Sequence, residues 1–220
     1  MKENRVWMDW RSRIVAPCFL LLALCPLLLS CGYERNNPYD VCSGNEYIDM
    51  GTYYIAKYEA SRPDASSSSQ GNASSVACSR AGVLPWVDVD WNGAKTACEA
   101  AGGRLCNADE WGDSCDGVKG SGGSTYPYGD TYQGSTCNGS DAGKGGTVPT
   151  GSMSGCVSGL GAYDMSGNVW EWTNEASGST RVIRGGSFYD YDDRLECAYR
   201  YDNYPTYSSY DIGFRCCQDK

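Results

Sequence analysis

The longest run of apolar positions lies near the amino terminus. Residues 14–29 are almost entirely apolar, interrupted by Pro17 and Pro26, and they follow a start that carries Lys2 and three arginines. The run is too short and too proline-broken for a comfortable membrane span, which needs about 20 apolar residues. A basic start followed by a short apolar core is typical of a secretory signal. We therefore expect residues 1–30 to be a signal peptide.

Two short segments alternate apolar and polar positions in the way that strands do. Residues 47–50 and 53–59 carry aromatic and branched side chains with a period of two, and Gly51 lies between them. The pattern predicts a β-hairpin that turns at Gly51. The stretch 61–77 contains four consecutive serines and almost no apolar residue, which indicates a surface loop.

The clearest helical period covers residues 91–101, with Asp90 as the expected N-cap and two glycines after the last turn. The expected buried face of this helix consists of Trp91, Ala94, Ala97, Cys98 and Ala101. A second short helix is expected over residues 107–111, capped by Asn107. Residues 112–161 are rich in glycine and serine, and so long a loop in a compact domain needs ties such as disulfides or bound cations.

Composition excludes several kinds of chemistry. The 220 residues fit one domain, contain no histidine and carry a formal net charge of -9. The lack of histidine excludes a Ser-His-Asp triad, histidine-based zinc and iron sites, and imidazole proton transfer. An acidic chain also has the wrong sign for phosphate backbones, so nucleic acid is not an expected partner.

The end of the apolar run predicts a lipid anchor. Residues 28–31 read Leu-Leu-Ser-Cys, which resembles the lipobox of bacterial lipoproteins. The resemblance implies that Cys31 is diacylated, that residues 31–45 form a lipid-bearing tether, and that the exported protein is held at the outer membrane or cell surface. Glu34, rather than an aspartate, lies near the new terminus, so no inner-membrane retention signal is visible. An ordinary cleaved signal peptide is the alternative.

The remaining cysteines predict a disulfide framework. Of 13 cysteines, two lie in the signal peptide and Cys31 takes the lipid. The remainder is even in number, as expected for disulfides in an exported chain, and each bridge would add about 2–4 kcal/mol. Metal ligation is the alternative, but the chain contains no C-x-x-C pair. The adjacent Cys216 and Cys217 are expected to bond to different partners.

Several blocks in one order carry a family resemblance. They are residues 85–91, 104–111, 126–130, 160–173, 181–188 and 211–216, which read PWVDVDW, RLCNADEW, YPYGD, LGAYDMSGNVWEWT, RVIRGGSF and DIGFRC. Together they resemble the formylglycine-generating enzyme family, also called sulfatase-modifying factors, over about residues 46–217. The resemblance implies a compact, disulfide-rich α+β fold with little regular secondary structure, distantly related to C-type lectins.

The resemblance also implies bound calcium. Asp164 and Glu171 would supply side-chain oxygens, and Gly167 and Val169 would supply backbone carbonyls, which suits an ion that prefers six to eight oxygen ligands. The alternative is that both acids cap turns and pair with arginines. A second, weaker family site would map onto Asn138, Gly139, Asp141 and Gly143.

The copper site of the family is missing from its expected place. Active members hold copper with two cysteines five residues apart, where this chain has Asp190 and Leu195. A carboxylate and a leucine cannot form a thiolate site for Cu(I), so we expect neither copper nor a catalytic residue here. The family's structural bridges map onto Cys98–Cys216 and Cys115–Cys197.

Four further residues near the family blocks are expected inside the domain. Trp170 and Trp172 alternate with polar neighbours and are expected in the core. Arg184 and Arg215 lie beside glycine turns and are expected to be buried partners of carboxylates.

Aromatic and acidic residues gather around the missing copper site. The candidate ligand groove consists of Phe188, Tyr189, Asp190, Tyr199 and Tyr201. Tyrosine-rich loops suit recognition because each ring gives a large contact area at low entropic cost. We therefore expect a calcium-stabilised module that binds an extracellular peptide, a glycan or a sulfatase-like protein and lacks oxidase activity. The alternatives are an active oxidase that converts a sulfatase cysteine to formylglycine at a relocated copper site, a solvated loop without a ligand, and lectin-like sugar binding.

Overall fold

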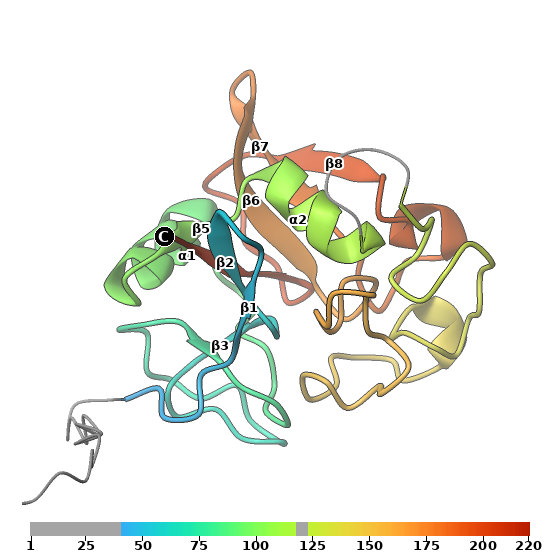
Figure 1. The fold of residues 1–220 in the computed structure, drawn as a ribbon. Helices are drawn as coiled ribbons and strands as arrows, with labels where there is room; N and C mark the ends of the chain where they lie inside the picture. Colours follow the sequence, from blue (N-terminus) through green and yellow to red (C-terminus); the bar gives the residue numbers. More distant parts are fainter. Residues whose placement is uncertain (1–40, 118–122) are drawn as a thin grey trace, which may run out of the picture. The chain divides into compact units, whose positions relative to one another are not determined.

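The computed structural model describes residues 41–117 and 123–220 (Figure 1). The expected signal peptide, Cys31 and most of the expected tether lie outside the described residues. Within the described ranges, no helix is long and apolar enough to cross a membrane. Cys42, near the end of the expected tether, forms a disulfide with Cys78 and is therefore bound to the folded domain.

The first sheet joins both ends of the domain. Its strands are β1 (Tyr47–Asp49), β2 (Tyr53–Ala56), β10 (Cys216–Asp219) and β5 (Arg104–Leu105), in that order and all antiparallel. Strands β1 and β2 form the predicted hairpin, and Gly51 adopts a φ of 87° in its turn. Strand β2 ends earlier than predicted because the chain moves on to form β3 (Ala60–Ser61), which pairs with β4 (Cys78–Ser79).

The second sheet carries most of the residues of interest. Its strands are β8 (Arg200–Asn203), β7 (Thr180–Arg184), β6 (Trp170–Ser177) and β9 (Ile212–Phe214), in that order. Strands β6 and β7 form a long antiparallel hairpin whose tip projects from the domain (Figure 1). Strand β9 pairs with β6 in parallel. The order brings residues from the last third of the chain around β6.

Both predicted helices form. Helix α1 (Trp91–Ala100) begins where Gly93 N–H donates to Asp90 Oδ1 at 2.8 Å, as the capping prediction required. Helix α2 (Ala108–Asp116) is longer than predicted because Ser114 and Cys115 continue its buried face. Two short 3₁₀ turns, η1 (Ser140–Ala142) and η2 (Asp192–Leu195), interrupt the loops.

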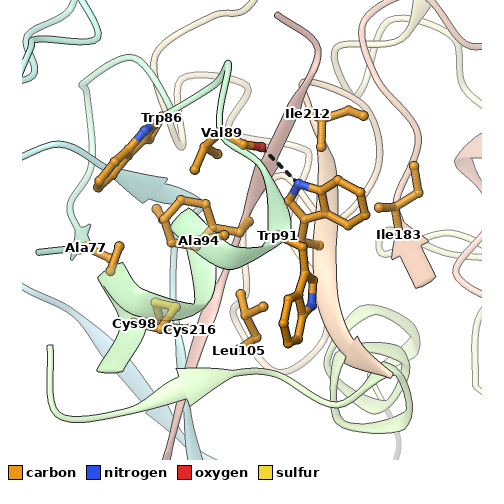
Figure 2. Packing of buried hydrophobic residues seen from close by; sticks show 14 of the residues in the cluster. Ala77, Trp86, Val89, Trp91, Ala94, Cys98, Leu105, Ile183, Ile212 and Cys216 are labelled. Carbon is orange, nitrogen blue, oxygen red and sulfur yellow. Dashed lines mark hydrogen bonds between the residues drawn. A yellow bond between two sulfur atoms is a disulfide. The ribbon is translucent and has the colours of Figure 1, made fainter. Parts of the chain in front are cut away.

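The main hydrophobic core lies between α1 and the second sheet (Figure 2). Trp91 on α1 and Trp172 on β6 are both buried, and each indole N–H donates to a backbone carbonyl, Thr173 O at 2.8 Å and Val89 O at 3.0 Å respectively. Trp170 is also buried, so both tryptophans of the family block lie in the core as predicted.

All ten cysteines of the described ranges are paired. The bridges are Cys42–Cys78, Cys98–Cys216, Cys106–Cys217, Cys115–Cys197 and Cys137–Cys156. The two pairings implied by the family resemblance are present, and the adjacent Cys216 and Cys217 bond to different partners, as predicted. The bridges of Cys115 and of Cys137–Cys156 tie down the long glycine-rich excursion.

Candidate functional site

A fully buried ion pair lies at the centre of the family block. Strand β6 places Glu171 in the interior, where Arg215 Nη2 donates to Oε1 at 2.8 Å and Arg215 Nε donates to Oε2 at 3.1 Å. The indole N–H of Trp111 also donates to Oε2, at 2.7 Å. Both charged side chains are completely buried. The expectation that Arg215 is a buried partner of a carboxylate is therefore confirmed.

Two more carboxylates lie near this ion pair. Asp164 is buried, with a φ of 58°, and its Oδ2 accepts from Gly151 N–H at 2.7 Å. Glu59, which sequence reasoning did not single out, is fully buried and accepts from Asn168 Nδ2 at 2.6 Å and from Val169 N–H at 3.2 Å. Burial raises the pKa of Asp164 to about 7. Burial, with the nearby carboxylates, also holds the pKa of Glu59 well above its usual range.

Three residues of the first expected calcium site, Asp164, Gly167 and Val169, lie on one buried turn, and Glu171 follows on β6. The carboxylates of Glu171, Asp164 and Glu59 all lie near the guanidinium of Arg215. Their oxygens are of the kind that calcium prefers, but Glu171 is already paired with Arg215, and the raised pKa values of Glu59 and Asp164 reduce the negative charge of the group. In the described ranges, no group of three or more His, Cys, Asp or Glu side chains could hold a metal ion. Calcium stays a prediction.

The residues of the second expected site differ in their exposure. Asn138 and Gly139 are buried, whereas Asp141 and Gly143 are exposed on and after η1. Asn138 Nδ2 donates to Asn168 Oδ1 at 3.0 Å, while Asp141 Oδ2 accepts from the hydroxyl of Tyr132 at 3.1 Å. Asn138 Oδ1 is buried without a hydrogen-bond partner in the described part of the chain. The second calcium site therefore also stays a prediction.

The two positions assigned to copper-binding cysteines are filled in other ways. Asp190 is buried, and its Oδ2 accepts from the N–H and the hydroxyl of Ser187, both at 2.9 Å. Leu195 is buried against the backbone of Gly139 and Gly186, where an added Cβ would clash with its methyl groups. One position thus holds a hydrogen-bonded carboxylate and the other a packed aliphatic side chain.

Most of the exposed aromatic side chains of the described ranges come from the stretch of chain that holds these two positions, and we call this group the aromatic face. We define it as Phe188, Tyr189, Tyr191, Tyr199, Tyr201, Tyr204, Tyr207 and Tyr210. Six of the tyrosines have between 46% and 63% of their surface exposed, while Tyr199 is half-buried. Phe188 is buried beneath Tyr189, with ring centres 4.4 Å apart. The rings of Tyr189 and Tyr210 meet edge to face at 5.8 Å.

The predicted groove therefore takes a different form in the structure. Of its five residues, Tyr189 and Tyr201 are exposed, Tyr199 is half-buried, and Phe188 and Asp190 lie inside as supports. The later tyrosines complete the exposed surface. The ligand groove stays a prediction, and sequence spacing could not separate exposed rings from supporting ones.

The backbone beneath the aromatic face is anchored to the core. Asp88 N–H donates to Ser209 O at 3.0 Å and Trp91 N–H donates to Pro205 O at 3.2 Å, which ties the loop between β8 and β9 to the start of α1. Trp170 N–H donates to Asp211 O at 2.9 Å. The rings therefore project from a loop whose path is fixed at several points.

Arg184 is buried as predicted, but its partners differ from the predicted carboxylates. It donates from Nη2 to Cys197 O at 2.7 Å and packs over the ring of Trp111, 5.1 Å from its centre, and within the described ranges it forms no ion pair. Burial lowers its pKa to about 10. With α2, Arg184 lines a cavity of about 680 Å³ that sequence reasoning missed, because the cavity joins residues far apart in the chain.

Comparisons with known proteins agree with this architecture. Residues 32–220 match the family model described as "Sulfatase-modifying factor enzyme 1-like domain". The chain is 33% identical to the mouse formylglycine-generating enzyme over 168 residues, which cover 61% of this chain and 44% of that protein. It is 35% identical over 152 residues to the mouse "Inactive C-alpha-formylglycine-generating enzyme 2", covering 60% and 48%. The chain thus spans about half the length of these curated relatives.

Solved structures show the same fold. Treponema denticola variable protein 1 superposes with a TM-score of 0.59 at 17% identity, covering 76% of this chain and 84% of that one. PvdO from Pseudomonas aeruginosa gives a TM-score of 0.56 at 19% identity, covering 76% and 80%. The predicted fold class, a disulfide-rich α+β fold of the formylglycine-generating enzyme type, is confirmed.

Proposed function

The chain belongs to the sulfatase-modifying factor enzyme 1-like family, and from this premise we propose that it is a binding module that keeps the family scaffold without the copper oxidase. One observation carries the proposal. The positions assigned to the copper-binding cysteines hold Asp190 and Leu195, and the stretch of chain around them carries six exposed tyrosines. The surface that would receive an oxidase substrate in the family therefore carries side chains here that suit binding rather than copper chemistry.

The construction of the aromatic face supports a binding function. A tyrosine ring offers a large, amphipathic contact surface with only two rotatable side-chain bonds, so little entropy is lost on binding. The backbone hydrogen bonds of Ser209 and Asp211 fix the loop before any ligand arrives. Such pre-organisation lowers the free-energy cost of association.

An active oxidase is the less favoured alternative. It would need a pair of free thiols, and every cysteine in the described ranges is in a disulfide. One of the curated relatives is itself named an inactive formylglycine-generating enzyme, so the family contains a protein with that designation.

We propose that calcium stabilises the module. Asp164, Glu171 and the carbonyls of Gly167 and Val169 would hold the ion, which would supply positive charge to a buried group of carboxylates that has one guanidinium. These residues orient the turn before β6. They are buried rather than presented to a ligand, so the ion's contribution would be structural.

We also propose that the protein is exported and anchored by a lipid on Cys31. Five disulfides in the described domain suit an oxidising compartment, and the basic start and apolar run suit an export signal. The ligand would then be an extracellular peptide, glycan or sulfatase-like protein met at the cell surface.

The proposal is tested by comparing three full-length proteins on peptide and glycan arrays. The first is the wild type, and the second is the face variant Tyr189→Ser/Tyr201→Ser/Tyr210→Ser. The third is the control Tyr54→Ser, on the first sheet. We expect ligands bound by the wild type and the control to be lost by the face variant. Retention of every ligand by the face variant, with its thermal unfolding unchanged, would contradict a binding function for this face.

A further inference from the structure

The aromatic face carries an excess of negative charge. Residues 188–211 contain six acidic residues, Asp190, Asp192, Asp193, Glu196, Asp202 and Asp211, against two basic ones, Arg194 and Arg200, and no lysine. Both arginines are already engaged. Arg194 Nη1 lies 3.1 Å from Asp190 Oδ1, and Arg200 pairs with Glu175 outside this segment.

Several carboxylates of this segment form no ion pair with a described residue. Asp192 and Asp193 are exposed on η2 next to Tyr191, and neither forms an ion pair with any described residue. Asp202 accepts from the hydroxyl of Thr180, and Asp211 accepts from the hydroxyl of Ser209, so neutral groups hydrogen-bond these carboxylates without neutralising their charge.

The rings of the face likewise have no internal cation. The cation–π contacts of the described ranges use Tyr58, Tyr163, Trp86, Trp91, Trp111 and Tyr54. None of these rings belongs to the aromatic face. Tyrosine faces attract ammonium and guanidinium groups, an interaction that strengthens when water is excluded.

From these observations we infer that the partner of the aromatic face is a protein segment rich in arginine or lysine. Its cationic side chains would lie on the faces of Tyr189, Tyr201 and their neighbours and pair with Asp192 and Asp193. An anionic glycan would be repelled by the uncompensated carboxylates. A neutral glycan would stack on the rings but form no ion pair with the carboxylates. A basic protein segment would form both kinds of interaction, which is why we favour it.

Because the inference rests on the proposed function, its test uses defined probes in place of arrays. The full-length protein in detergent is titrated calorimetrically with a blocked peptide of alternating arginine and glycine, its glutamate counterpart, and maltotetraose. We expect only the arginine peptide to bind, and its affinity to fall about tenfold when salt rises from about 50 to about 300 mM, because exposed charges are screened.

Two charge-matched variants separate local from general electrostatics. Asp192→Asn/Asp193→Asn removes two charges from the face, and the control Glu99→Gln/Asp109→Asn removes two from α1 and α2. The face variant should bind the arginine peptide several-fold more weakly, and the control should bind like the wild type. Thermal unfolding of both variants checks that the fold is unchanged.

Three results would overturn the inference. These are failure of the arginine peptide to bind, equal weakening by both variants, and binding of maltotetraose in place of the peptide. Each leaves the proposed function to be decided by the array comparison of the tyrosine variants, which does not depend on the sign of the partner's charge.

Discussion

At the scale of single residues, the buried carboxylates and Arg215 decide the stability of the centre. Replacing Arg215 with leucine leaves Glu171 without its charged partner beside Asp164 and Glu59. Breaking a buried ion pair from one side costs about 3–5 kcal/mol. We therefore expect Arg215→Leu to lower the free energy of unfolding by about that amount in a denaturant titration. The control Lys57→Gln, which breaks the partly exposed pair with Glu46, should cost less than about 1 kcal/mol. Equal losses would contradict a central function for Arg215.

The raised pKa of Asp164 gives a pH dependence with a definite sign. In the folded protein its pKa is about 7, compared with 3.8 for the free group. The carboxyl of Asp164 therefore binds a proton more tightly in the folded than in the unfolded protein. Its contribution to the free energy of unfolding is complete below pH 3.8 and is lost as the pH rises to 7.

The measurement is the free energy of unfolding of wild type and Asp164→Asn as a function of pH, with a chelator present. Between pH 4 and 7 the wild type should lose up to about 1.4 kcal/mol per pH unit relative to Asp164→Asn. If calcium occupies the expected site, adding it should remove most of this loss, because the ion favours the charged carboxylate. A pH profile identical in the two proteins would show that Asp164 titrates normally.

At the scale of elements, the tyrosine loops expose their rings, and we expect these rings to contribute little to folding. Tyr204 and Tyr207 have 63% and 46% of their surface exposed, whereas the backbone around them is held by Pro205 O and Ser209 O. We expect Tyr204→Ser/Tyr207→Ser to change the free energy of unfolding by less than about 1 kcal/mol, because exposed side chains away from buried contacts contribute little. Trp170→Ser, at the core beneath the same face, should cost several times more. A large loss of unfolding free energy in Tyr204→Ser/Tyr207→Ser would show instead that these two rings stabilise the fold.

Elements set by local pattern could be predicted from the sequence, and those set by distant partners could not. Helix α1 follows from its 3.6-residue period and the Asp90 cap, and the β1–β2 hairpin from period two around Gly51. Glu59 is different. A charged residue next to a strand is normally read as exposed, and its burial depends on Asn168 and Val169, more than a hundred residues away. The partners of Arg184 could not be predicted for the same reason, since Cys197 and Trp111 are brought to it by the fold.

At the scale of the whole molecule, the disulfides should differ in importance. The Cys98–Cys216 bridge closes a separation of 118 residues, while Cys137–Cys156 closes 19. Restriction of the unfolded chain grows with loop length, from about 3 kcal/mol for short loops to about 4.7 kcal/mol for loops near 100 residues. Because Cys106–Cys217 closes nearly the same long loop, both long bridges must be removed to release it, and we expect Cys98→Ala/Cys216→Ala/Cys106→Ala/Cys217→Ala to lower the thermal unfolding midpoint more than Cys137→Ala/Cys156→Ala. A larger decrease in the midpoint from loss of Cys137–Cys156 would show that this bridge stabilises the folded state by more than restriction of the unfolded chain.

The central claim is that the scaffold of an oxidase family is used here without its oxidase. The most direct test incubates the folded protein with calcium, Cu(I), oxygen, a reductant and a peptide carrying the sulfatase C-x-P-x-R motif. Mass spectrometry then follows the peptide's cysteine. With the five disulfides verified intact, we predict no conversion to the aldehyde, because Asp190 and Leu195 cannot supply thiolates. Formation of formylglycine would contradict the claim and show that a copper site exists elsewhere in the chain.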